Sequence, residues 1–197
     1  MIRQEHGHHL AVMALVLGLH ASAGGAAEFV WTDGAGDGNW TTPGNWNIGS
    51  GYPDGADDTA TITNSSRAIS VPAGLTVGEI LIGGTYSGTN TLTGTLTVST
   101  AGGKSGSLTL NAGMLQTAKD AAGDIAVCNT FAIGSATGVV RRTATAGNGT
   151  GKTVTAASLT IAAGGALHAD SEGFAVGNGP GKGTGDGNGG SGGSHGG

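Results

Sequence analysis

The chain has 197 residues, of which 42 are Gly, while charged residues make up 11% and aromatic residues 4%. This much Gly without a strict three-residue period, and with only 4 Pro, excludes a collagen-like triple helix. Low charge combined with recurring Thr, Val, Ile and Leu argues against an intrinsically disordered chain. The net charge of −5 gives no electrostatic reason to bind nucleic acid. We therefore expect an all-β protein that has no nucleic-acid partner.

Residues 1–23 have the features of a secretory signal peptide. Arg3 precedes the apolar run Leu10–Leu19, and Ala21 to Ala23 matches the small-residue pattern of a cleavage site. The apolar run is shorter than the roughly 20 residues of a transmembrane helix, so we expect no membrane-spanning segment. The sequence therefore predicts a protein that is secreted to the extracellular space or to the outer surface of a bacterial cell.

All three Trp residues lie in the next segment, 28–62. Large aromatic side chains bury much area, so three of them in a short segment predict a local core. A repetitive β-structure also needs such an element, because its first coil otherwise exposes an apolar end and a free strand edge. We expect Trp31, Trp40 and Trp46 to form a cap over the first coil.

The motif WTDGAGDGNWTTPGNWN, followed by YPDGADDTATI, is specific enough to suggest a family. It resembles the opening of autotransporter-like and related bacterial β-helix surface proteins, over about Trp31 to Ile62. The resemblance implies a parallel β-helix in an exported, adhesin-like protein, and it carries no catalytic residue with it.

The same segment is rich in Asp beside Gly. Clustered carboxylate oxygens are the ligands that Ca²⁺ prefers, whereas Asp beside Gly is also the ordinary composition of tight turns. We favour the turn interpretation, keep calcium as the alternative, and expect no other cofactor. The residues concerned are Asp33, Asp37, Asp54, Asp57 and Asp58.

Residues 63–172 repeat one short phrase, an alternating Leu-Thr-aliphatic strand followed by a turn of small residues. It occurs as LTVGEILIGG (75–84), LTVSTAGG (96–103), LTLNAGML (108–115) and LTIAAGGAL (159–167). This period-two alternation predicts half-buried strands. One such strand cannot bury its apolar row alone, whereas stacked coils bury it against one another. We therefore expect a parallel β-helix, or β-solenoid, with an antiparallel β-sandwich as the alternative.

Two local features of the repeats lead to further expectations. The segment AGMLQTAKDAAGD (112–124) is short and flanked by Gly, which predicts a turn or a single helical turn. Cys128 is the only Cys and lies in an alternating apolar stretch, so we expect a small buried hydrophobic residue there.

Residues 173–197 are dominated by Gly and have no large apolar residue after Val176. This composition predicts a flexible, low-complexity tail. The sequence stops inside this run without a terminating element, which predicts a truncated chain.

The sequence has no motif of a serine hydrolase, a zinc protease or a P-loop enzyme. Asp170 and Glu172 are close enough to share a strand face, but acids beside Gly are typical of solvated turns. We therefore expect a non-catalytic stalk or passenger segment of an adhesin-like surface protein. The alternatives are a carbohydrate-binding adhesin module that contacts surface glycans on a host or neighbouring cell, or the N-terminal part of a β-helix polysaccharide-degrading enzyme whose active site lies elsewhere.

Overall fold

The computed structural model describes residues 26–118, 123–134, 139–141 and 152–168. This part of the chain consists mainly of short strands, which confirms the all-β class. It holds no helix that is both long and apolar enough to cross a membrane. The predicted signal peptide (1–23) and the predicted tail (173–197) lie outside the described residues.

The strands are short because a small-residue turn follows almost every one of them. They are β1 (Glu28–Val30), β2 (Thr59–Ile62), β3 (Ile69–Val71), β4 (Leu75–Val77), β5 (Glu79–Ile82), β6 (Thr89–Leu92), β7 (Leu96–Val98), β8 (Leu108–Leu110), β9 (Met114–Thr117), β10 (Ile125–Ile133), β11 (Val139–Arg141), β12 (Val154–Ile161) and β13 (Ala166–His168). Two 3-10 turns, η1 (Pro43–Asn45) and η2 (Ala101–Gly103), lie between them.

The strands pair in three rows, and successive members of each row come from successive passes of the chain. The first row holds β1, β2, β5, β8 and the C-terminal halves of β10 and β12. The second row holds β3, β6, β9, β11 and β13, and the third row holds β4, β7 and the N-terminal halves of β10 and β12. All these pairs are parallel, so the alternative of an antiparallel sandwich is wrong.

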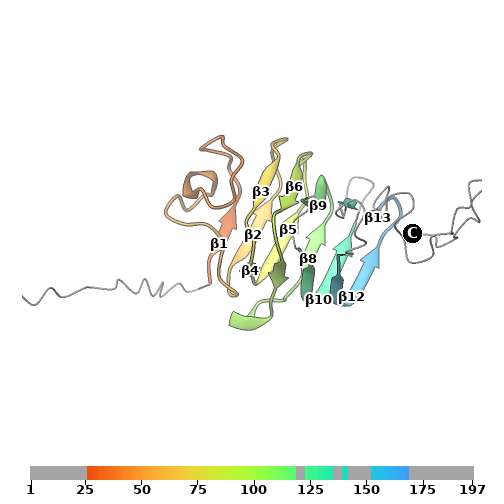
Figure 1. Cartoon of the computed structure of the whole chain (residues 1–197). Coiled ribbons are helices and arrows are strands. Elements are labelled where there is room, and N and C mark those ends of the chain that lie inside the picture. The colour runs from red at the N-terminus through yellow and green to blue at the C-terminus, as the bar shows by residue number, and fades with distance from the viewer. Residues whose placement is uncertain (1–25, 119–122, 135–138, 142–151, 169–197) are drawn as a thin grey trace, which may run out of the picture.

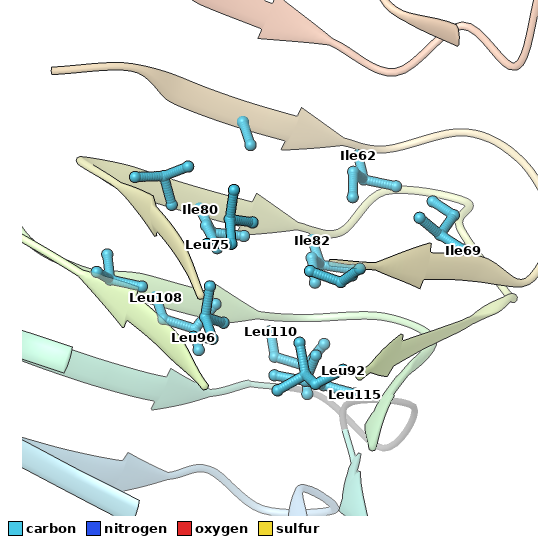
Figure 2. Packing of buried hydrophobic residues seen from close by; sticks show 14 of the residues in the cluster. Ile62, Ile69, Leu75, Ile80, Ile82, Leu92, Leu96, Leu108, Leu110 and Leu115 are labelled. Atoms are coloured by element: carbon cyan, nitrogen blue, oxygen red, sulfur yellow. The ribbon is translucent and has the colours of Figure 1, made fainter. Parts of the chain in front are cut away.

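The first and third rows belong to one curled sheet, because β10 and β12 each contribute to both rows. The second row forms a separate five-stranded sheet. In Figure 1 the strands follow one another from β1, in orange, to β12 and β13, in blue. The side chains between the rows form the core, which Figure 2 shows from close by.

Inward-facing side chains of neighbouring strands lie in register with one another. In the first row Ile62 pairs with Ile82, Ile82 with Leu110, and Leu110 with Ile133. All four side chains are at most 2% exposed. Each aliphatic residue is thus covered by its counterpart one strand earlier and one strand later, as the stacking argument from the sequence requires.

The predicted alternation within single strands is confirmed. In β7, Leu96 and Val98 are buried while Thr97 between them is half-buried and faces outward. Thr97 also lies in register with Thr76 of β4, so the third row presents Thr side chains on its outer face.

Two local expectations are wrong. The expected turn or helical turn contains the strand β9, which pairs with β6 and buries Leu115 and Thr117. Here pairing with β6 outweighs the weak preference of this short, Gly-flanked segment for a turn. Cys128 is exposed rather than buried, because it directly follows the buried Val127 and so takes an outward position in the alternation of β10.

Candidate functional site

The segment between β1 and β2 places all three Trp side chains in one buried cluster. Trp31, Trp40 and Trp46 are at most 2% exposed. The ring of Trp46 lies in the middle, with its centroid 5.1 Å from that of Trp31 and 4.8 Å from that of Trp40. Phe29 of β1 adds a third edge-to-face contact with Trp46 at 6.1 Å. Such contacts each contribute about 0.5–1.5 kcal/mol beyond the burial of area.

The indole N–H groups differ in what they bind. Nε1 of Trp40 donates to the carbonyl oxygen of Pro53 at 2.9 Å, and Nε1 of Trp46 donates to that of Trp40 at 2.7 Å. Nε1 of Trp31 is buried and has no hydrogen-bond partner in the described part of the chain. The first two bonds fix the orientations of the Trp40 and Trp46 rings, whereas the ring of Trp31 is oriented by packing and its backbone N–H donates to the carbonyl oxygen of Thr61 at 2.9 Å.

The same segment pairs with the first strands of two rows. β1 lies on β2 in the first row. In the second row the N–H of Trp40 donates to Ser70 at 3.1 Å, and the N–H of Ser70 donates to Gly38 at 2.8 Å. Gly38 has a φ of +69°, and a Cβ there would lie 2.5 Å from the carbonyl oxygen of Ala68, so only Gly fits this approach. The backbone edges of β2 and β3 are therefore not free (Figure 1).

The Trp cluster also contacts the inward row of aliphatic side chains. Trp40 lines a small internal void of about 10 Å³ together with Val71, Ile82 and Leu92 from the rows. A void of this size holds at most about one water molecule. The segment 28–58 is thus packed onto the core itself and not only onto the strand edges.

Asn45 organises the loop around the Trp cluster, and the sequence analysis did not single it out. It is fully buried, its Oδ1 accepts the N–H of Ala35 at 3.0 Å, and its Nδ2 donates to Asp37 at 2.6 Å and to the carbonyl oxygen of Asn39 at 3.0 Å. Asn is a common turn residue, so its type alone gives no sign of this role. Its position beside Trp46 is the one signal that the sequence contains.

Asp37 accepts hydrogen bonds on both carboxylate oxygens. Oδ1 accepts the N–H of Asn39 at 2.9 Å as well as the Asn45 amide, and Oδ2 accepts the Thr42 hydroxyl at 2.7 Å. These bonds, the one from the Asn39 N–H first among them, hold the pKa of the Asp37 carboxyl well below its ordinary value. Asp37 therefore stabilises the loop as a charged hydrogen-bond acceptor.

Asp58 plays a similar part in the turn before β2. It is 8% exposed, and its Oδ2 accepts the N–H groups of Asp54 and Gly55 at 3.1 and 2.9 Å. Its Oδ1 accepts the N–H of Ala27 at 3.3 Å. This side chain joins the start of the first row to the turn that precedes its second strand.

The remaining aspartates differ in their surroundings. Asp33 has a φ of +58° and its Oδ1 lies 2.7 Å from Nε of Arg67, while Asp54 is exposed and Asp57 is half-buried. Among the described residues no three His, Cys, Asp or Glu side chains come together as a metal-sized group. The contacts of Asp37 and Asp58 support the turn interpretation. Calcium binding stays a prediction that calorimetric titration with Ca²⁺ would check. Asp170 and Glu172 lie outside the described residues.

Because the indole N–H of Trp46 has a hydrogen-bond acceptor and that of Trp31 has none in the described residues, removing the two N–H groups should affect stability differently. Trp46→Phe leaves the buried carbonyl oxygen of Trp40 without its donor, whereas Trp31→Phe removes an N–H that has no partner in the described residues. We expect Trp46→Phe to lower the free energy of unfolding by about 1 kcal/mol more than Trp31→Phe. Urea denaturation of both variants measures the difference, and an equal or larger loss in Trp31→Phe would contradict the assignment.

The lowered pKa of Asp37 predicts a pH-dependent contribution to stability. A carboxyl whose pKa is lower in the folded state stabilises the fold fully above its unfolded pKa and loses this contribution as the pH falls through its folded pKa. We therefore expect Asp37→Asn to unfold at lower urea than the unmodified chain at pH 7, and the gap to shrink below about pH 4. Asp54→Asn, at an exposed side chain, is the matched control and should show no such gap. A gap that is the same at pH 7 and pH 3 would contradict the role of the charge.

The protein-family models, the curated proteins and the solved structures with which the chain was compared contain no match to it. The resemblance to autotransporter-like proteins therefore stays a prediction from the motif around the three Trp residues.

Proposed function

We propose that the three rows of strands are the three faces of a parallel β-helix, or β-solenoid, in which each pass of the chain forms one coil. The support is the order of pairing. The chain visits the first, second and third rows in turn through β2, β3 and β4, and then repeats this order through β5, β6 and β7. Each new coil lies in parallel on the one before it.

We further propose that this column is a structural stalk or passenger segment of an exported, adhesin-like surface protein. The observation that carries this proposal is the continuous core of the described residues, in which aliphatic side chains of successive strands cover one another and the void beside Trp40 is only about 10 Å³. In such a column the side chains serve to hold coil on coil, and Trp31, Trp40 and Trp46 act as its N-terminal cap. Export rests on the predicted signal peptide, which places the protein outside the cell or on its surface.

A second candidate function is carbohydrate binding by the outer face of the third row. Thr76, Thr97 and Thr155 lie in one outward register with Ala126 between the last two. A regular row of hydroxyl groups is able to hydrogen-bond sugars, and it is also what any solvated strand face of Thr presents. Binding on a glycan array that Thr76→Ala/Thr97→Ala abolishes would favour the adhesin module over the stalk. The other alternative, a polysaccharide-degrading enzyme whose active site lies elsewhere, would need its catalytic Asp or Glu residues to lie outside the described residues.

A stalk must resist proteases outside the cell, and the burial of its aliphatic residues predicts this resistance. Thermolysin cuts next to aliphatic residues, and in β8 both Leu108 and Leu110 are fully buried. We expect the chain from Ala27 onward to be cut slowly across β2 to β10. Leu110→Ala should lose about 2–5 kcal/mol of stability.

When a protease cuts the transiently opened protein, the cleavage rate follows the population of the opened state. The loss of stability in Leu110→Ala then raises its cleavage rate roughly 30-fold or more. Thr109→Ala, on the outer face of the same strand, is the matched control and should be cut at nearly the original rate. The rate of loss of the intact band on a gel measures both. Rapid cleavage within β2 to β10 of the unmodified chain would contradict a protease-resistant column.

A further inference from the structure

The pairing of β1 with β2 leaves β1 with an outer edge of its own. In the described part of the chain β1 is the end strand of its sheet (Figure 1). The N–H of Trp31 donates to the carbonyl oxygen of Thr61 at 2.9 Å, so Trp31 directs its N–H toward β2. Neighbouring residues of a strand direct their backbone groups to opposite sides. The backbone groups of Glu28 and Val30 therefore point away from β2, toward the outer edge.

The chain returns along this outer edge for a short distance only. Trp31 and Trp46 form an isolated antiparallel bridge, and the N–H of Asn47 donates to the carbonyl oxygen of Val30 at 2.9 Å. The backbone then turns away, because the N–H of Gly49, which has a φ of +70°, donates to the carbonyl oxygen of Trp46 at 3.1 Å. The returning backbone thus bonds the edge as far as Val30 and goes no further along it.

The side chain of Asn47 covers the next part of the edge. Its Oδ1 accepts the N–H of Val30 at 2.8 Å, and its Nδ2 donates to the carbonyl oxygen of Glu28 in a longer bond of 3.4 Å. A carboxamide carries the same acceptor and donor groups as a peptide bond. It therefore takes the place of the peptide group that the turning backbone does not supply. Asn47 is itself exposed, so it performs this role at the surface and not in the core.

The surroundings of Asn47 would make an open edge prone to association. The exposed fractions of Val30 and Ile48 are 36% and 44%, and both residues adjoin the Asn47 contacts in the chain or in space. A strand edge with free backbone groups and exposed apolar side chains is a template for pairing with another chain. Every copy of the protein carries the same edge, and two identical edges pair antiparallel about a two-fold axis. A second copy is therefore the partner that fits this edge.

We propose that Asn47 is an edge block: its side chain occupies the N–H of Val30 and the carbonyl oxygen of Glu28, and so keeps β1 of one copy from pairing with β1 of another. The proposal goes beyond the proposed function and rests only on the contacts of β1. Its outcome is therefore independent of whether the column is a stalk. Because the block is a side chain and not a strand, one substitution opens it.

Analytical ultracentrifugation of the full chain over a range of concentrations tests the edge block. We expect the unmodified chain to stay monomeric, and Asn47→Ala to approach about twice the monomer mass as the concentration rises. Asn47→Asp is the matched control and should stay monomeric, because it keeps an acceptor for the N–H of Val30 and adds a charge at the edge. Adding Val30→Lys to Asn47→Ala should restore the monomer, because a charged side chain on an edge strand opposes pairing.

Amide hydrogen exchange, read at single residues by NMR on dilute and monomeric samples, shows how the substitution acts. Asn47→Ala should speed the exchange of the Val30 N–H roughly tenfold or more, as expected when a local contact opens. The N–H of Trp31 should exchange as in the unmodified chain, because its bond to Thr61 stays in place. Loss of protection at Trp31 as well would mean that Asn47 holds β1 on β2, and this result overturns the proposal.

The remaining results also decide the question. An Asn47→Ala chain that is monomeric at every concentration overturns the edge block, and so does dimerisation of the unmodified chain. A dimer that persists after Val30→Lys lies on another surface and overturns it too. Thr42→Ala removes a hydrogen bond to Asp37 within the same loop and leaves β1 untouched. If Thr42→Ala associates as strongly as Asn47→Ala, the cause is a loosened loop and the proposal is wrong.

Discussion

The structure depends on mutual cover between successive strands. A three-residue strand such as β7 has two inward side chains, Leu96 and Val98, and these cannot form a core by themselves. They are buried because Leu75 and Val77 lie on one side and Ile125 and Val127 on the other. Stability in such an arrangement is close to a sum over neighbouring layers, so every interior layer is supported twice and every end layer once.

This constraint fits the composition of the N-terminal end, which differs from that of the middle. The core beyond β2 is mainly aliphatic, with Tyr86 and Phe131 as its buried aromatic side chains, whereas all three Trp side chains gather before β2. The Trp46 ring lies between those of Trp31 and Trp40. An end is also where strand edges would otherwise be free to pair with other chains. Pairing of β1 with β2, and of the Gly38 to Trp40 backbone with Ser70, removes that hazard from the N-terminal end.

Much of this fold could be predicted from the sequence, because the period-two alternation determines which side chains face inward. Leu96 and Val98 are buried, as the alternation in LTVSTAGG predicts. Parallel stacking followed from the argument that such strands need cover. The exceptions have local causes: Cys128 follows the buried Val127 and therefore faces outward, and pairing with β6 makes a strand of Met114–Thr117. The register between neighbouring strands of a row could not be predicted, because these strands are separated by many residues in the sequence and no local pattern says which residues align.

The polar residues of the loop were the hardest part to predict, and they also determine what the candidate site does. The roles of Asp37 and Asp58 depend on which backbone N–H groups the fold brings to them, and no spacing in the sequence fixes this. Asn45 can be fully buried because most of its possible hydrogen bonds are satisfied there by Ala35, Asp37 and Asn39. A carboxylate whose oxygens already accept such bonds gives up stability when it turns to another ligand. The hydrogen bonds of Asp37 and Asp58 therefore serve first to hold the segment 28–58 in its folded form, and any ligand of these aspartates must compete with the fold itself.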